Sequence, residues 1–215
     1  MNFTRCYPLF KKPCVRYEGK YIQIMKKLST LFKKDPKDLG RVINEINPEN
    51  EWALKFGRPT RKFDGTSCAI INGELYKRYD AKKNKKGIKK PIPKGAIPCQ
   101  EPDEKSGHHP HWIKCDEKDK SNKYHFEAFE DLIKLNSTPL DGTYELCGEK
   151  VQANPENIKG HKLIMHGKNI LPLINFDFER IKHFLTVTDI EGIVFHHLTD
   201  GRMCKIRKSD FGIRR

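Results

Sequence analysis

The residues of this 215-residue chain that are best suited to covalent chemistry form the short run Lys62-Phe63-Asp64-Gly65. A lysine amine is a nucleophile only when it is neutral, and its ordinary pKa is about 10.4. Lowering that pKa to between about 7 and 8 takes about 4 kcal/mol, which burial and neighbouring positive charges can supply. Lys205 and Arg207 are suitable neighbours, because alternate residues of a strand point to the same face. These two cations can also neutralise a phosphate group on which negative charge develops.

Two glutamates, Glu145 and Glu191, lie in separate short runs whose sequences are typical of strands. Carboxylates there can hold a ribose hydroxyl or a hard cation such as Mg²⁺, which proteins bind through one or two carboxylates together with phosphate oxygens. Taken alone, each glutamate has the alternative interpretation of an exposed strand residue. The functional interpretation therefore depends on these residues occurring together with Lys62.

The order of these runs resembles that of the covalent nucleotidyltransferases, the superfamily of ATP-dependent RNA and DNA ligases and mRNA capping enzymes. The resemblance covers the chain from about residue 50 onward. The residues that match the family's motifs are Lys62, Asp64 and Gly65 (motif I), Arg78 (motif Ia), Glu145 (motif III), Glu191 (motif IV), and Lys205 and Arg207 (motif V). The runs 79–83, 142–146 and 205–212 are most similar to those of small, stand-alone RNA ligases.

This resemblance implies both a fold and a reaction. The fold is an α+β nucleotidyltransferase domain, the ATP-grasp-like adenylation domain of ligases, built on antiparallel sheets with flanking helices. In the reaction, Lys62 attacks the α-phosphate of ATP, pyrophosphate leaves, and AMP stays on the lysine. AMP then passes to the 5′-phosphate of an RNA, and a 3′-hydroxyl displaces it. The implied partner is an RNA with those two ends, and the implied metal is Mg²⁺ or Mn²⁺.

The resemblance also assigns roles to individual residues. Lys62, Lys205 and Arg207 are the catalytic residues. Glu145 takes the ribose, and Glu191 lies on the metal side, with Glu145 as a second metal ligand. His166 falls where related ligases often place a ring that stacks on the adenine, and an exposed or structural histidine is the alternative. The full set expected to bind the nucleotide is Arg61, Asp64, Gly65, Arg78, Glu145, His166, Lys205 and Arg207.

Three features depart from the family pattern. Arg61 stands where several RNA ligases have a glutamate that helps to read the adenine, so the choice between ATP and GTP stays open. Arg207 replaces the usual second lysine of motif V, and a guanidinium fork is not equivalent to an ammonium. Only ten residues follow Lys205, so we expect no C-terminal OB-fold domain. This favours a stand-alone RNA ligase, and the alternatives are a capping-type guanylyltransferase and a non-catalytic basic RNA-binding module.

The charge of the chain is distributed unevenly. The formal net charge is +14, and residues 1–95 hold 24 Lys and Arg against 9 Asp and Glu, whereas residues 96–215 hold 18 against 19. One-sided positive charge fits binding to nucleic-acid phosphates. The densest run is 82–90, for which a solvated loop is the alternative. We therefore expect the basic N-terminal part to bind RNA.

Several classes of protein are excluded by the sequence pattern. No apolar run approaches the ~18 to 20 residues of a membrane span, and the N-terminus lacks the apolar stretch of an export signal. We expect an intracellular protein, cytoplasmic or nuclear and not secreted, that is a monomer without a membrane partner. Seven cysteines without a CxxC pair argue against a disulfide scaffold. Whether the cluster Cys99, His108, His109, His111 and Cys115 binds zinc stays open, because its spacing matches no compact zinc finger.

The elements that position these residues are predicted from local patterns. Residues 1–50 are expected to form a basic segment packed on a main domain of residues 51–215, with an irregular insertion at 87–123. Asn72-Gly73 between two strand-like runs predicts a hairpin, because both turn residues need positive φ. Apolar periodicity predicts helices over 19–34, 124–135 and 177–185, and strands are expected over 66–71, 74–79, 143–147, 193–197 and 202–207.

Overall fold

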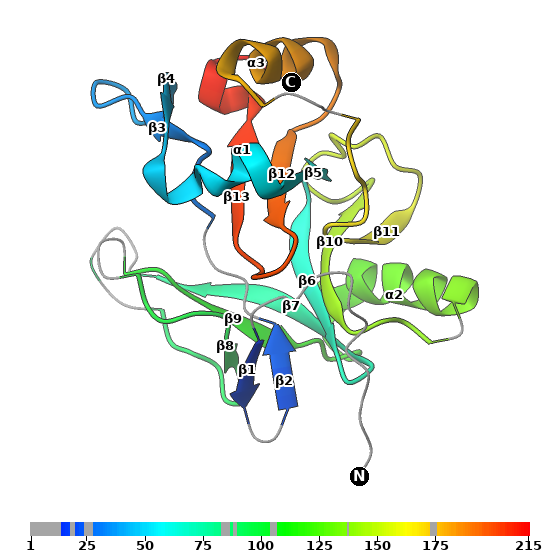
Figure 1. Cartoon of the computed structure of the whole chain (residues 1–215). Coiled ribbons are helices and arrows are strands. Elements are labelled where there is room, and N and C mark those ends of the chain that lie inside the picture. Colours follow the sequence, from blue (N-terminus) through cyan, green and yellow to red (C-terminus); the bar gives the residue numbers. More distant parts are fainter. Residues whose placement is uncertain are drawn as a thin grey trace. The chain divides into compact units, whose positions relative to one another are not determined.

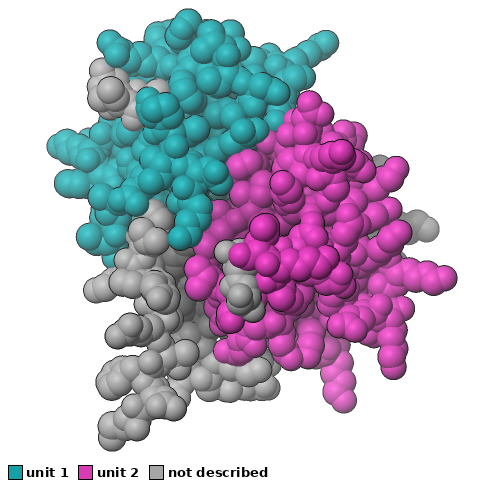
Figure 2. All heavy atoms as spheres, turned by 90° about the vertical axis from the view of Figure 1, so that its right-hand side faces the viewer, with its two compact units in different colours: residues 1–13, 27–62, 167–215 teal, residues 14–26, 63–166 magenta. Residues whose placement is uncertain are grey.

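The computed structural model describes residues 14–17, 20–23, 28–82, 87, 90–103, 107–136, 138–172 and 176–215. The chain divides into two compact units, which Figure 2 colours teal and magenta. The described residues of unit 1 lie within Lys27–Lys62 and Gly167–Arg215, and those of unit 2 lie within Cys14–Lys26 and Phe63–His166. The boundaries after Lys62 and after His166 therefore fall at two of the residues that the sequence singles out. The expected boundary after residue 50 stays a prediction.

Unit 1 is built on a three-stranded antiparallel sheet in the order β13-β12-β5 (Figure 1). A separate two-stranded sheet pairs β3 with β4, and short helices connect the strands. The bounds are β3 (Phe32–Lys34), β4 (Val42–Ile46), η1 (Pro48–Asn50), α1 (Trp52–Phe56), β5 (Gly57–Lys62), α3 (Phe178–Val187), β12 (Gly192–His197), β13 (Met203–Arg207) and η3 (Lys208–Phe211).

The core of unit 1 lies on one face of the three-stranded sheet. Alternate residues of β12 and β13 supply the fully buried side chains of Ile193, Phe195, Cys204 and Ile206. Ile181 and Leu185 of α3, which are four residues apart on one helical face, belong to the same cluster. The side chain of Asp177 caps α3 by accepting a hydrogen bond from the backbone N of Arg180 (2.9 Å). The opposite face of the sheet is thus available for polar side chains.

Unit 2 is built on a six-stranded antiparallel sheet in the order β11-β10-β6-β7-β9-β8. A two-stranded sheet of β1 and β2 and the helix α2 belong to the same unit. The bounds are β1 (Cys14–Tyr17), β2 (Lys20–Gln23), β6 (Thr66–Ile71), β7 (Glu74–Ala81), β8 (Ile97–Pro98), β9 (His109–Lys114), η2 (Lys120–Asn122), α2 (Lys123–Asn136), β10 (Gly142–Gly148) and β11 (His161–Met165).

The two faces of the six-stranded sheet carry separate hydrophobic clusters. Cys68 and Ile70 of β6 point into the cluster that also contains Ala128 of α2, whereas Ala69 and Ile71 point into the cluster around Trp112. Because successive residues of a strand face opposite sides, an uninterrupted apolar run such as Cys68–Ile71 is typical of a strand covered on both faces. The buried strand β6 begins directly after Gly65 in the sequence.

The predicted hairpin is confirmed. Asn72 and Gly73 form the turn between β6 and β7 with φ of 52° and 76°. The carboxylate of Asp141 accepts hydrogen bonds from both turn amides, at 2.7 and 3.0 Å. The predicted helices over 124–135 and 177–185 and the predicted strands over 143–147, 193–197 and 202–207 also match α2, α3, β10, β12 and β13 closely. The expectation of helices alongside antiparallel sheets is confirmed.

The prediction of a helix over 19–34 is wrong. Where the structure describes this range, it contains β2 (Lys20–Gln23) and β3 (Phe32–Lys34). The backbone N of Leu31 donates to the carbonyl oxygen of Lys205 (2.8 Å), and the backbone N of Lys205 donates to Ser29 (3.0 Å). The segment is extended because its backbone pairs with β13, and the buried side chains of Leu31 and Phe32 join the core of unit 1.

The expected irregular insertion at 87–123 contains regular structure. Its strand β9 pairs with β7 over six residues, and β8 pairs with β9 at the edge of the six-stranded sheet. Most of the lysine run 82–90 lies outside the described residues, so its expected contact with RNA stays a prediction. In the described part of the chain, no helix is long and apolar enough to cross a membrane.

Candidate active site

Lys62, Lys205 and Arg207 lie on one face of the three-stranded sheet of unit 1. Lys62 is the last residue of β5 and Arg207 the last of β13, and both pair with Gly192 of the central strand β12. Residues that are directly opposed across antiparallel strands share a face, and so do alternate residues along one strand. Gly192 lies between Lys62 and Arg207 and has no side chain. A larger residue would not fit there, because its Cβ would lie 2.3 Å from a carbonyl oxygen of β13.

Glu191 forms an ion pair with Lys62 through its Oε2 atom. It precedes β12, and its backbone carbonyl accepts a hydrogen bond from the backbone N of Lys208 (2.9 Å). The two side chains are 25% and 20% exposed, so the pair is shielded from water and yet open to a ligand. The structure thus brings together the predicted nucleophile and the predicted metal-side carboxylate.

Lys205 has a depressed pKa. Burial is the main cause, and the positive charges of Arg207 and Lys62 act in the same direction, whereas Asp210 and Glu191 oppose them. The result is a pKa of about 8, against an ordinary value of 10.5. The ammonium of Lys205 is therefore only weakly solvated, and an incoming anion would be attracted to it strongly.

Arg207 is held by an aspartate that the sequence analysis did not identify. The side chain of Asp210 is completely buried and accepts hydrogen bonds from the backbone N, Nε and Nη2 of Arg207, at 2.8, 3.3 and 3.0 Å. The Nζ atom of Lys34 donates to Oδ1 of Asp210 at 2.7 Å, the same oxygen that accepts from Nη2 of Arg207. Burial raises the pKa of Asp210, but the hydrogen bonds and charges of Arg207 and Lys34 outweigh it and lower the pKa below its ordinary value. The fork geometry of the Arg207 guanidinium suits this pairing, which a lysine ammonium could not make through two nitrogens.

Arg61 lies on the other face of the sheet from Lys62. It is adjacent to Lys62 in β5 and pairs with Ile193, whose side chain is in the core. Its Nη2 atom donates to the backbone carbonyl of Asp189 (3.4 Å), and its backbone N donates to Asn169 (2.8 Å). The structure does not bring Arg61 together with Lys62, Lys205 and Arg207, and its expected part in base selection stays a prediction.

In unit 2, Gly65 packs tightly on β10. A Cβ at Gly65 would lie 2.2 Å from the carbonyl oxygen of Leu146, 2.8 Å from the Sγ atom of Cys147 and 3.0 Å from the Cγ atom of Glu145. Only a glycine fits in this space without moving the β10 backbone. The Lys-x-Asp-Gly run therefore needs its glycine so that the chain after Asp64 can lie against the strand that carries Glu145.

Glu145 and His166 are bound to each other. The side chain of Glu145 is 11% exposed, and its Oε2 atom lies 2.9 Å from the Nε2 atom of His166 and 3.3 Å from the hydroxyl of Ser67, which donates to it. The Nδ1 atom of His166 lies 3.0 Å from the hydroxyl of Thr143. His166 thus orients Glu145 by its ring edge, and adenine stacking on its face stays a prediction.

Arg78 forms a different local group in the same unit. Its Nε atom donates to Oδ1 of Asp80 (3.1 Å), and the guanidinium carbon lies 5.8 Å from the centre of the Trp112 ring. The Nε2 atom of His108 also contacts Oδ1 of Asp80 (3.2 Å). Burial raises the pKa of Asp80, and the Arg78 and His108 interactions more than compensate, so the pKa is lowered. Binding of nucleotide phosphate by Arg78 stays a prediction.

The residues that could hold a metal lie apart in the sequence and in different units. Glu191 belongs to unit 1 and Glu145 to unit 2. Among the residues that the structure describes, no three His, Cys, Asp or Glu side chains gather as a metal site would require. The Cys99 thiol and the Cys115 thiol are both buried, which raises the pKa of each to about 12.

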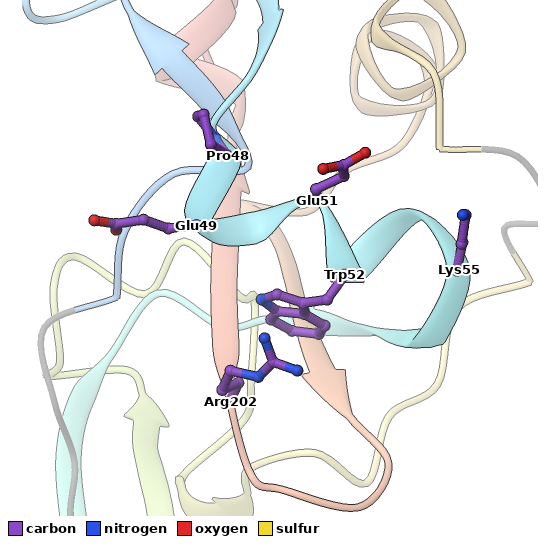
Figure 3. A pocket seen from close by; sticks show the side chains of 6 residues that line it. All are labelled: Pro48, Glu49, Glu51, Trp52, Lys55 and Arg202. Carbon is purple, nitrogen blue, oxygen red and sulfur yellow. The ribbon is translucent and has the colours of Figure 1, made fainter.

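Elsewhere in unit 1, an open pocket of about 360 Å³ lies beside α1 (Figure 3). The Arg202 guanidinium carbon lies 5.4 Å from the centre of the Trp52 ring. The lining residues are Pro48, Glu49, Glu51, Trp52, Lys55 and Arg202. The pocket contains none of the residues that the sequence singles out.

Comparison with solved structures found a likeness to an RNA ligase. An RNA ligase from Naegleria gruberi, solved as a mutant with AMP and Mn, matches this chain with a TM-score of 0.42 and 14% sequence identity. The match covers 90% of this chain and 73% of the ligase chain. No family model matches the chain, and no curated protein matches it. At this TM-score the likeness leaves residue roles open, so the function proposed for this chain rests on its own residues.

Two residues that sequence reasoning missed are Asp210 and Glu156. Asp210 follows Arg207 by three residues, and an acid at that spacing at the start of a helical turn is a signal that could have been found. Glu156 accepts a hydrogen bond from the backbone N of Asp64 (2.8 Å) across 92 residues of sequence, and no local pattern could have revealed it.

Proposed function

We propose that this protein is a lysine adenylyltransferase of the RNA ligase type, which forms a lysyl-AMP intermediate on Lys62. The observation that carries the proposal is the shared sheet face in unit 1, where Lys62 is paired with Glu191 and accompanied by the cations Lys205 and Arg207. The cations Lys205 and Arg207 are suited to bind a phosphate and to stabilise the charge that develops there, and the Lys62 amine can attack once it is neutral and released from Glu191.

In the first step, the neutral Nζ atom of Lys62 attacks the α-phosphorus of ATP. A nitrogen–phosphorus bond forms, the bond from the α-phosphorus to the bridging oxygen breaks, and pyrophosphate leaves. Lys62 gives up two protons to solvent, one before the attack and one from the nitrogen that carries AMP. Lys205, whose pKa is about 8, is the cation that would face the charged phosphate. Arg207 supplies a permanent charge held in place by Asp210.

In the later steps, AMP would pass from Lys62 to an RNA 5′-phosphate, and an RNA 3′-hydroxyl would displace AMP to form the phosphodiester. The net charge of +14 supports a polyanionic partner, because each neutralised phosphate releases counterions. Sequence specificity is not required for this interaction, since backbone phosphates are common to all strands.

The carboxylate of Glu191 fits a hard divalent cation such as Mg²⁺ or Mn²⁺ that accompanies ATP. Carboxylate and phosphate oxygens are the donors that Mg²⁺ takes, and Glu191 is only 20% exposed. Such a cation would supply charge neutralisation at the phosphates. Because Glu191 is paired with Lys62, binding of a cation by Glu191 would favour release of the lysine. Glu145, oriented by His166, is proposed to take the ribose.

Intact-mass measurement after incubation with ATP and Mg²⁺ tests this proposal. The expected result is a mass gain of one AMP on the wild-type protein and none on Lys62→Arg, which keeps a cation next to Glu191 but lacks the amine nucleophile. Lys134→Arg, at a side chain that is 72% exposed on α2, is the matched control and should gain AMP normally. A parallel incubation with GTP tests whether the protein prefers ATP or GTP, which the arginine at residue 61 leaves open.

The alternatives give different results in the same measurement. A gain of GMP in preference to AMP would indicate a capping-type guanylyltransferase. No gain with either nucleotide in folded protein, together with RNA binding that Lys62→Arg leaves unchanged, would contradict the proposal and indicate a non-catalytic RNA-binding module. If the adduct forms, ligation of an RNA with a 5′-phosphate and a 3′-hydroxyl is the second assay.

A further inference from the structure

The turn that follows Lys62 is held by a distant side chain. The Oε1 atom of Glu156 accepts a hydrogen bond of 2.8 Å from the backbone N of Asp64, and this group is partly buried. Asp64 lies between Phe63 and Gly65, and Gly65 is fixed against the β10 backbone. The backbone of Asp64–Gly65 is thus held from two sides, by Glu156 and by β10.

Glu156 lies in the segment that connects β10 to β11, and the backbone of this segment is unusual. Four of its non-glycine residues adopt positive φ between 48° and 59°: Gln152, Ala153, Asn154 and Asn157. Asparagine tolerates this conformation, whereas glutamine and alanine rarely adopt it. Such conformations persist where the surrounding structure holds them, and they are frequent at functional sites.

The segment that carries Glu156 is held at both ends. The side chain of Asn154 accepts from the backbone N of Ile158 and donates to its carbonyl oxygen, both at 3.0 Å. At the end of the segment, the ring of His161 is 4% exposed and contacts Glu127 of α2 at 2.9 Å and the backbone N of Lys150 at 3.2 Å. The Glu156 carboxylate that binds Asp64 thus belongs to a segment held by side-chain hydrogen bonds of Asn154 and His161.

We propose that Glu156 is a positioning residue for lysyl-AMP formation, acting by holding the Asp64 amide and so the turn covalently joined to Lys62. The inference rests on the proposed adenylyltransferase function, and it adds a residue that lies outside every motif of the sequence. The effect depends on a hydrogen-bond acceptor at residue 156 rather than on its charge, because the partner is a neutral backbone amide.

Single-turnover kinetics of lysyl-AMP formation test the inference. Glu156→Ala removes the acceptor and should lower the rate at saturating ATP by about 10-fold to 100-fold, because it leaves a partly buried backbone N–H without its partner. The KM for ATP should change by less than about threefold. Glu156→Gln keeps an acceptor oxygen and should stay within about threefold of the wild-type rate. Glu156→Asp, with a shorter side chain, should fall between them.

The matched control is Glu149→Ala in the same segment. The Oε1 atom of Glu149 accepts a weaker hydrogen bond of 3.3 Å from the backbone N of Gly160 and does not bind Asp64. This variant should keep the wild-type rate. A wild-type rate in Glu156→Ala, an equal loss in Glu149→Ala, or an equal loss in Glu156→Gln would each overturn the inference.

Hydrogen exchange of the Asp64 amide is the second readout, and it does not require activity. Glu156→Ala should raise the exchange rate of this amide at least about 10-fold, and Glu156→Gln should not. If the wild-type protein forms no adduct, the proposed function fails, and equal exchange in wild type and Glu156→Ala would additionally overturn the hold on Asp64. The two failures are thereby distinguishable.

Discussion

Burial of Lys205 should make the free energy of unfolding of unit 1 depend on pH. The substitution Lys205→Met should remove this pH dependence. The unfolded chain protonates Lys205 with its ordinary pKa of 10.5, whereas the folded protein protonates it with a pKa of about 8. Between these two values the unfolded state binds more protons, so stability rises as the pH rises from about 8 to 10.5. At about 1.4 kcal/mol for each pH unit, the charged lysine costs the fold about 3 kcal/mol at pH 7.

Lys205→Met removes the charge and keeps a side chain of similar length. The free energy of unfolding of this variant relative to wild type should therefore fall by about 3 kcal/mol between pH 7 and pH 10.5, whatever constant difference in packing the substitution introduces. Titrating groups that do not interact with Lys205 contribute equally to both proteins and cancel in the difference.

Urea unfolding measured by tryptophan fluorescence is the assay. The chain has two tryptophans, Trp52 in unit 1 and Trp112 in unit 2, so a Trp112→Phe background leaves a probe in the unit that contains Lys205. Lys134→Met, at an exposed position on α2, is the surface control. A difference between wild type and Lys205→Met that stays constant within about 1 kcal/mol from pH 7 to 10.5 would refute the reasoning about burial.

Two further substitutions test the packing and the ion pairs of the site. Gly65→Ala should destabilise unit 2 by at least about 1 to 3 kcal/mol, measured by thermal unfolding, because the added methyl group overlaps the β10 backbone, and unaltered stability would contradict the close approach. Asp210→Ala should cost about 3 to 5 kcal/mol at pH 7, because it leaves the charges of Lys34 and Arg207 without their buried partner. Since the pKa of Asp210 is lowered in the fold, this contribution is present above its unfolded pKa of about 3.9 and is lost as the pH falls through the lower folded value. An Asp210→Ala penalty that remains undiminished at the lowest pH at which both proteins fold would contradict this assignment.

Local signals in the sequence were sufficient for the elements whose formation depends on their own residues. Asn72-Gly73 supplies the two positive φ values of the hairpin turn, and the apolar periodicity of 124–135 and 177–185 matches the buried faces of α2 and α3. The runs that carry Glu145 and Lys205 are strands as expected. These elements could be predicted because turn chemistry and side-chain alternation act over a few residues.

Elements stabilised by distant partners could not be predicted in the same way. The range 19–34 has helical periodicity, but Leu31 is extended because its backbone is bound by Lys205, far along the chain. The strands β8 and β9 contain prolines, histidines and lysines that are typical of loops, and they are strands because β7 pairs with β9. In both cases, hydrogen bonds to a distant strand outweigh local propensity.

The amino-acid sequence by itself determined which residues of this protein can carry the chemistry, because nucleophile, cations and carboxylates are matters of residue type and order. Only the tertiary structure decided their partners. It pairs Lys62 with Glu191, orients Glu145 through His166, fixes Arg207 through Asp210 and directs Arg61 to the opposite face. The physical reason is that pKa, charge pairing and orientation depend on burial and on contacts within a few ångströms, and strand register creates those contacts between residues that are far apart in the sequence.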